Sequence, residues 1–249
     1  MPKTSPTVTR KTSARRGPNT LAVDIGGTGI KAAVLDAQGE MASERLRVLT
    51  PRPLTRMLLV NTIVGLTKTF PPFERVSVGF PGVIRKGVVK TAINLGDDVF
   101  RGFNLGAALE RKFGRPTRVL NDADMAGYGA VKGKGVEMVV TLGTGVGTAL
   151  FDDGRLCPHM ELAHHPFRKG ETYEDQIGDA ARKALGPTRW SHRVAQAIEA
   201  WRDLLWFDRL YLGGGNARRL TWHPPRDVTL VDNSAGLMGG IRLWDDEIH

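Results

Sequence analysis

The chain has 249 residues, of which 41% are apolar, enough for one large or two modest globular domains with a net charge of +9. No run approaches the roughly 18 uninterrupted apolar residues of a membrane-spanning helix, and the first twenty residues lack the apolar segment of a secretory signal. The single cysteine, Cys157, excludes an internal disulfide and a multi-cysteine zinc site, so a cytoplasmic location fits best.

The N-terminal segment 1–20 is basic and rich in Pro, Ser and Thr. It has no acidic residue, and it carries Lys3, Arg10, Lys11, Arg15 and Arg16. This composition is typical of a solvated, disordered leader, although such a segment could also hold nucleic acid or another polyanion. We therefore expect a disordered leader over 1–20. The positive charge left on the ordered chain suits a groove for a phosphate-rich ligand.

The first ordered unit predicted by the sequence is a strand, a glycine loop and a second strand. Leu21–Asp24 and Lys31–Asp36 are the strands, and Gly26-Gly27-Thr28-Gly29 connects them. Glycines allow backbone N–H groups to converge on an anion, and Thr28 adds a hydroxyl donor. Lys31 adds a positive charge beside the loop.

This first glycine loop has two interpretations. It lacks the Gly-Lys-Ser/Thr ending of a P-loop and does not open a helix, so a tight hairpin turn explains it as well as a phosphate site does. As a phosphate site it would place Asp24, at the end of the first strand, where a carboxylate could hold Mg²⁺ directly or through water.

The next hundred residues alternate helical and strand patterns. We expect helices at Pro53–Phe70, Leu105–Phe113 and Asp124–Lys132, and strands at Val76–Gly79 and Thr117–Leu120.

Asn121 and Asp122 follow the last of these strands. Phosphoryl transfer needs a carboxylate beside the attacking hydroxyl to accept its proton. Taken alone, Asp122 is better explained by an Asx turn or a helix N-cap than by a catalytic role. Glu161, His164 and Glu174 later in the chain favour the catalytic interpretation, because sugars are recognised by paired hydrogen bonds from charged and amide groups.

A second strand–loop–strand unit repeats the layout of residues 21–39. Strand Met138–Leu142 leads through Gly143-Thr144-Gly145-Val146-Gly147 into strand Thr148–Phe151. Three glycines at alternate positions imply a close backbone approach or a special turn. Two copies of one phosphate-binding device predict two related halves that face each other across a cleft and clamp a polyphosphate chain.

After this unit we expect a long helical stretch that ends with Trp190–Phe207. It is followed by strand Arg209–Leu212, the loop Gly213-Gly214-Gly215, strand Val228–Val231 and a terminal helix from about Ala235. Scattered cations could line a track for a long polyanion, but we favour solvated surface positions for most of them. They are Arg168, Lys169, Arg182, Lys183, Arg189, Arg218 and Arg219. A zinc site built from His159, His164, His165 and Glu161 is a weaker alternative, because no second cluster supports it.

These motifs together resemble the ROK family of the actin-like, hexokinase-type superfamily, and within it the polyphosphate glucokinase branch. The resemblance runs from about Leu21 to Gly240. The segments that carry it are Asp24–Lys31, Val78–Val83, Gly87–Ala92 with Asn94, Asn121-Asp122, Thr141–Phe151, Glu161–His164, Tyr173-Glu174 and Leu212–Asn216.

The resemblance implies an α/β fold of the actin-like ATPase (ribonuclease H-like) type, with two domains and a cleft between them. Residues 21–120 plus about 235–249 would form the smaller domain and 121–234 the larger one. It further implies a homodimer that transfers a phosphoryl group, with Mg²⁺, from inorganic polyphosphate and/or ATP to the 6-hydroxyl of glucose.

The resemblance also assigns roles to individual residues. Asp122 would be the catalytic base and Asp24 the Mg²⁺ residue. The sugar would be bound by Asn94, Asn121, Asp122, Glu161, His164 and Glu174. The donor phosphates or nucleotide would be bound by Gly26, Gly27, Thr28, Lys31, Thr141, Gly143, Thr144, Gly145, Gly213, Gly214 and Gly215. The zinc-binding cysteines of many family members are absent, so no zinc is expected, and Ala163 replaces a motif glycine.

Three alternatives stay open from the sequence. One is an ATP-only ROK kinase for mannose, fructose or an N-acetylhexosamine. Another is a non-catalytic sugar-binding protein of the same fold, although such a protein would not need both phosphate loops. The third is a transcription regulator, but the residues before Leu21 lack helical periodicity, so we expect no helix-turn-helix domain and no DNA partner. We also expect no membrane partner.

Overall fold

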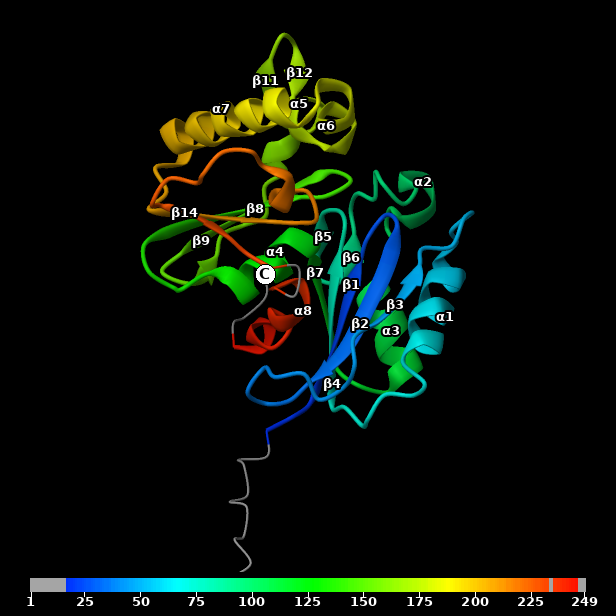
Figure 1. Cartoon of the computed structure of the whole chain (residues 1–249). Helices are drawn as coiled ribbons and strands as arrows, with labels where there is room; N and C mark the ends of the chain where they lie inside the picture. Colours follow the sequence, from blue (N-terminus) through cyan, green and yellow to red (C-terminus); the bar gives the residue numbers. More distant parts are fainter. Residues whose placement is uncertain (1–16, 233–234, 246–249) are drawn as a thin grey trace, which may run out of the picture.

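The computed structural model describes residues 17–232 and 235–245, and within them two five-stranded sheets form the centres of two lobes (Figure 1). The basic residues of the expected leader lie outside the described residues. The first strand already includes Thr20.

The first lobe is built on the sheet β3-β2-β1-β4-β7. Its strands are β1 (Thr20–Ile25), β2 (Gly29–Leu35), β3 (Leu46–Leu49), β4 (Arg75–Phe80) and β7 (Thr117–Asn121). β1 pairs antiparallel with β2 and parallel with β4, and β4 pairs parallel with β7. Leu21, Val23 and Ile25 alternate along β1 into one core, whereas Ala22 packs on the opposite face of the sheet, as expected for a strand covered on both sides.

The second lobe repeats this architecture in the sheet β10-β9-β8-β13-β14. Its strands are β8 (Val136–Leu142), β9 (Val146–Asp152), β10 (Arg155–Leu156), β13 (Arg209–Gly213) and β14 (Val228–Leu230). β8 pairs antiparallel with β9 and parallel with β13, and β13 pairs parallel with β14. Strand order and directions match those of the first sheet position by position, which confirms the prediction of two related halves.

Helices cover both sheets and fill the space between them (Figure 1). They are α1 (Arg56–Leu66), α2 (Asp97–Phe100), α3 (Leu105–Phe113), α4 (Asp122–Ala130), α5 (Tyr173–Ile177), α6 (Asp179–Leu185), α7 (Pro187–Leu205) and α8 (Ala235–Met238). α1 and α3 cover the outer face of the first sheet, α5 and α7 cover the outer face of the second, and α4 and α8 lie between the sheets. Among the described helices, none is both long and apolar enough to cross a bilayer.

Short elements complete the fold. They are β5 (Ile84–Arg85), β6 (Val88–Val89), β11 (Pro166–Arg168), β12 (Glu171–Thr172) and the 3-10 helices Leu162–His164, Ala217–Arg219 and Arg242–Trp244.

Three helices differ from their predicted bounds. Helix α7 begins at Pro187 and ends at Leu205, whereas the expected stretch ended with Trp190–Phe207, and Pro187 occupies the first turn, where a proline is tolerated. The pattern over Pro53–Phe70 overestimates α1, because Thr55 accepts a hydrogen bond from the Leu58 N–H at 3.2 Å and caps the helix there. The prediction of a helix over Asp124–Lys132 is wrong by two residues at each end. Asn121 caps α4, so the helix begins at Asp122 and ends at Ala130.

Candidate active site

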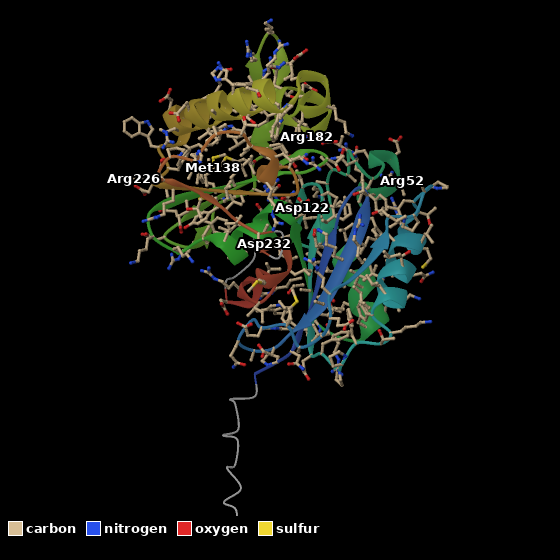
Figure 2. All side chains as sticks on the ribbon, in the orientation of Figure 1. Arg52, Asp122, Met138, Arg182, Arg226 and Asp232 are labelled. Carbon is tan, nitrogen blue, oxygen red and sulfur yellow. The ribbon has the colours of Figure 1, made fainter. Side chains whose placement is uncertain are left out.

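Every residue predicted for the site lines one cleft, of about 470 Å³, between the two lobes. The cleft lies where parallel strands end: β1, β4 and β7 in the first sheet, and β8, β13 and β14 in the second. Ligands of α/β proteins bind at such carboxyl ends. In Figure 2, Asp122 lies near the middle of the molecule, with Arg52 on the first lobe and Arg182 on the second.

The first glycine loop forms a closed turn at the end of β1. The Gly26 N–H donates to the Gly29 carbonyl at 2.9 Å. Asp24 and Lys31 face each other across the hairpin, and Lys31 Nζ lies 2.8 Å from Asp24 Oδ2. The ammonium group of Lys31 therefore already has a carboxylate partner, and it also holds one oxygen of Asp24 in place.

Two arginines that the sequence did not single out also contact this loop. Arg52 Nη2 donates to the carbonyl oxygens of Gly27 at 3.0 Å and Asn94 at 3.1 Å, so it joins the first glycine loop to the segment that carries Asn94. The guanidinium of Arg47 lies against Gly29, where an added Cβ would come within 2.7 Å of Arg47 Nε. Arg47 lines the cleft and adds positive charge where an anionic donor would enter.

The second and third glycine loops pack directly on each other. The Gly143 N–H donates to the Gly145 carbonyl at 2.9 Å. From the third loop, Asn216 donates its backbone N–H to the Leu142 carbonyl and its side-chain amide to the Gly143 carbonyl, both at 2.9 Å. Gly214 has φ +87°, and a Cβ there would lie 2.3 Å from the Leu142 oxygen, so only glycine allows this approach.

Asn121 and Asp122 have different structural roles. The buried Asn121 accepts hydrogen bonds from the N–H groups of Ala123 at 2.8 Å and Asp124 at 3.3 Å, and it donates to the Gly82 carbonyl at 3.2 Å. The N-cap interpretation of Asp122 is therefore wrong, because Asn121 is the cap. The Asp122 side chain is left at the first turn of α4, partly exposed to the cleft.

The environment of Asp122 favours its protonated form. Burial is the main cause that raises its pKa to about 7, and the negative charge of Asp24 is the next. Asp124 and Glu161 add smaller repulsions, while the Ala123 N–H opposes them. A carboxyl group with a pKa near the working pH is well matched to accept and release a proton.

Three of the predicted sugar-binding residues, Glu161, His164 and Glu174, converge on the second-lobe wall of the cleft and are called the sugar-side group below. His164 Nε2 lies 3.7 Å from Glu161 Oε2 and 4.0 Å from Glu174 Oε2. Glu174 also accepts a hydrogen bond from the Val146 N–H at 3.0 Å. A Cβ on Gly145 would lie 2.6 Å from Glu174 Oε2 and 3.4 Å from the amide of Asn94. The sugar-side group thus adjoins the second phosphate loop.

His159, which lines the cleft, and the buried Asp124 form a pair that the sequence reasoning missed. Both ring nitrogens of His159 face carboxylates, of Asp124 at 2.9 Å and of Glu161 at 3.3 Å. His165 instead directs Nδ1 to the Pro166 carbonyl at 3.1 Å and is exposed. These separate partners do not favour the zinc alternative, which needs the imidazoles to converge.

Ala163 is accommodated without strain. It lies in the 3-10 helix Leu162–His164, and its methyl group is buried in the second-lobe core cluster, which also contains Tyr173 and Trp201. The methyl group therefore points into packed protein and not into the sugar site.

Asp24 fits a site for Mg²⁺. It presents a hard oxygen ligand to the cleft beside the first phosphate loop, and Lys31 engages only Oδ2. The negative charge of Asp24 also raises the pKa of Asp122, so the two carboxylates together make this part of the cleft electronegative. Mg²⁺ in phosphoryl-transfer sites is held by one or two carboxylates, substrate phosphates and water.

The family model of the ROK family matches residues 20–163 of the chain. The protein belongs to the ROK family. Polyphosphate glucokinase of Mycobacterium tuberculosis is 31% identical to it over 259 residues, which cover 96% of each chain. N-acetylmannosamine kinase of Escherichia coli is 35% identical over 214 residues, which cover 82% of this chain and 69% of that protein.

Among solved structures, this ROK protein resembles the inorganic polyphosphate/ATP-glucomannokinase of Arthrobacter sp. strain KM. The two superpose with a TM-score of 0.82 at 30% identity, covering 91% of this chain and 98% of the other. The expected two-lobed α/β fold of the actin-like, hexokinase type is confirmed. The bounds 21–120 with about 235–249, and 121–234, stay a prediction.

Proposed function

We propose that this ROK protein is a sugar kinase that transfers the terminal phosphoryl group of inorganic polyphosphate, ATP or both to the 6-hydroxyl of glucose. The observation that carries the proposal is the position of Asp122, whose carboxyl lines the cleft together with the two phosphate loops and the sugar-side group Glu161, His164 and Glu174. Phosphoryl transfer depends on this kind of positioning.

In the proposed reaction, the sugar is held by hydrogen bonds to Glu161, His164 and Glu174. Asp122 accepts the proton of the 6-hydroxyl while that oxygen forms a bond to the terminal phosphorus. The bond between this phosphorus and the bridging oxygen breaks, and its electron pair leaves with the shortened donor. Asp122 then releases the proton to solvent, which a pKa of about 7 allows at neutral pH.

On the donor side, backbone N–H groups of the two glycine loops bind the anionic oxygens, and Arg47 and Lys31 add positive potential. Asp24 would hold Mg²⁺, which when bound neutralises negative charge on the donor oxygens. Closure of the lobes over the sugar would exclude water and limit hydrolysis of the donor. We further propose a cytoplasmic homodimer without DNA or membrane partners.

Polyphosphate as donor is supported by the names of two relatives, the mycobacterial polyphosphate glucokinase and the Arthrobacter polyphosphate/ATP-glucomannokinase. A kinase for another hexose is the second candidate, and the 35% identity to an N-acetylmannosamine kinase favours it.

The test is a panel of glucose, mannose, fructose and N-acetylmannosamine, each with ATP and with nucleotide-free polyphosphate, with and without a chelator of Mg²⁺. We expect phosphorylation of glucose that the chelator abolishes. A strict ATP requirement would end the polyphosphate part of the proposal. Absence of phosphorylation of every sugar with both donors would contradict the kinase function.

A further inference from the structure

The imidazole of His159 is buried between two carboxylates at the edge of the cleft. Its side chain is 4% exposed and that of Asp124 3%, whereas Glu161 is 34% exposed. Nδ1 lies 2.9 Å from a carboxylate oxygen of Asp124, and Nε2 lies 3.3 Å from Glu161 Oε1. Although burial opposes protonation, these two hydrogen bonds raise the pKa of His159 to about 9. The ring is therefore an imidazolium at neutral pH and donates to both carboxylates.

The first of these carboxylates is fixed to the helix that carries Asp122. Asp124 lies two residues further along α4, and its backbone N–H donates to the capping oxygen of Asn121 at 3.3 Å. A continuous series of contacts therefore leads from the first turn of α4 through Asp124 and His159 to Glu161.

The backbone around His159 is also held from two sides. Arg85, on the short strand β5 of the first lobe, donates to the His159 carbonyl at 3.3 Å. Thr148, on β9 of the second lobe, donates from its hydroxyl to the Met160 carbonyl at 3.2 Å. The imidazolium is therefore anchored before any ligand binds, which is the condition for a side chain that orients another one.

The two carboxylate oxygens of Glu161 have different partners in this arrangement. Oε1 is engaged by His159, while Oε2 lies 3.7 Å from His164, a distance that leaves it available to a ligand hydroxyl. Hydrogen bonding to His159 is also the first cause that lowers the pKa of Glu161, so this group stays an acceptor across neutral pH.

We propose that His159 is a positioning residue that fixes the Glu161 carboxylate relative to Asp122 and thereby sets the affinity and orientation of the bound hexose. The inference rests on the proposed function, since the hexose is the ligand concerned. His159 itself need not touch the sugar. It acts through Glu161, as the partners of a binding residue often do when they lock its rotamer.

The competing explanation is that the Asp124–His159–Glu161 network only stabilises the fold. Buried ion pairs often contribute little net stability, and removal of one partner leaves an unpaired charge that destabilises the whole protein. A purely structural role would lower the melting temperature and change all kinetic constants together. Loss of a positioning residue would instead weaken binding of the sugar and leave binding of the phosphoryl donor nearly unchanged.

The test compares His159→Gln with the matched control His165→Gln, because His165 is exposed and its ring donates to the neighbouring Pro166 carbonyl and to no carboxylate among the described residues. Gln can keep one hydrogen bond but not the charge that joins both carboxylates. For His159→Gln we expect the KM for glucose to rise about tenfold or more, while the KM for the phosphoryl donor changes less than about twofold. The control should keep both constants.

Binding is measured separately as the rise in melting temperature on addition of glucose without donor, which we expect to be smaller in His159→Gln. An unchanged glucose KM in folded His159→Gln, or equal rises in the sugar and donor KM, would overturn the inference. Should that variant not fold, Asp124→Asn carries the same test, because it keeps His159 and Glu161 but removes the anchoring charge. The wild-type protein in the same assay separates failure of the proposed function from failure of the positioning role. If the wild type phosphorylates no glucose, the proposed function fails. If the wild type and His159→Gln are equally active, only the positioning role of His159 is refuted.

Discussion

Glu174 accepts a hydrogen bond from the backbone N–H of Val146 at 3.0 Å, so a carboxylate of the sugar-side group is joined directly to the second phosphate loop. The same oxygen lies 4.0 Å from His164 Nε2. A hexose that engages Glu174 would also act on the loop that binds the donor. The two substrates are therefore expected to bind cooperatively, and by linkage each should strengthen the other to the same extent.

Glu174→Gln should abolish most of this coupling. The amide nitrogen of Gln cannot accept the Val146 N–H, and its oxygen is a weaker acceptor than a carboxylate. We expect glucose to tighten donor binding in the wild type and to have less than half of that effect on the variant. The measurement is a calorimetric titration of a non-reactive donor analogue with and without glucose, so that no turnover occurs. Glu199→Gln is the control, since Glu199 lies on α7 in an exposed pair with Arg202. Equal coupling in wild type and Glu174→Gln would contradict the account.

Gly145→Ala tests the same junction by steric means. Its Cβ would lie 2.6 Å from Glu174 Oε2, closer than side chains tolerate, so the loop or the carboxylate must move. We expect kcat/KM to fall by about 10²-fold for both substrates, as for an Ångström-scale displacement in a reacting site. The matched control is Gly65→Ala in helix α1, where nothing lies within 4 Å of the added methyl. That control should keep full activity and gain about 0.5–1 kcal/mol of stability.

Arg47→Ala should weaken donor binding without affecting the sugar. The Arg47 guanidinium lies against Gly29 at the first phosphate loop and lines the cleft, whereas Arg45, just before β3, does not line it. We predict a several-fold higher KM for polyphosphate, a weaker dependence of that KM on salt, and an unchanged KM for glucose. Arg45→Ala provides the comparison, and a similar loss there would show a general charge effect in place of a local contact.

Local sequence patterns were sufficient to predict the parts of the site whose structure is determined by residues adjacent in the chain. The strand–glycine–strand units became β1–β2 and β8–β9, and the strand before Asn121 became β7. Each rests on a short apolar run followed by glycines or a polar pair, which neighbouring residues determine. The edge strand Leu46–Leu49 was not predicted. Its side chains alternate between partly buried and exposed, but the apolar Leu49 takes an exposed position, so the sequence Leu-Arg-Val-Leu does not show the alternation.

Contacts between distant residues could not be predicted in this way. Asp124 and His159 are 35 positions apart and meet only because α4 packs between the two sheets. Asn121 and Asp122 are both good capping residues, so no local rule decides which one caps α4 and which one stays free for chemistry. The hydrogen bonds of the folded Asn121 decide it.

The free energy of unfolding should fall as pH rises, because ionised Asp122 is unfavourable in the folded protein. Its folded pKa of about 7 exceeds the ordinary aspartate value of 3.8, so the folded state binds this proton more tightly than the unfolded state does. The penalty is absent below pH 3.8, grows as pH rises, and is complete above about pH 7. Asn cannot ionise, so Asp122→Asn should melt at a higher temperature than the wild type at pH 8 in metal-free buffer, by about 2–4 °C for each kcal/mol of penalty removed, with a smaller difference at pH 5. Thermal unfolding monitored by circular dichroism provides the measurement, and a wild type more stable than the variant at pH 8 would refute the assignment.

The most direct test of the central claim is the turnover of Asp122→Asn with saturating glucose and donor. Because Asn121 and not Asp122 caps α4, the substitution should leave the fold and the glucose-induced rise in melting temperature in place. Loss of a general base is expected to lower kcat by about 10²–10⁴-fold. A kcat close to that of the wild type would contradict the assignment of Asp122 as the group that accepts the hydroxyl proton.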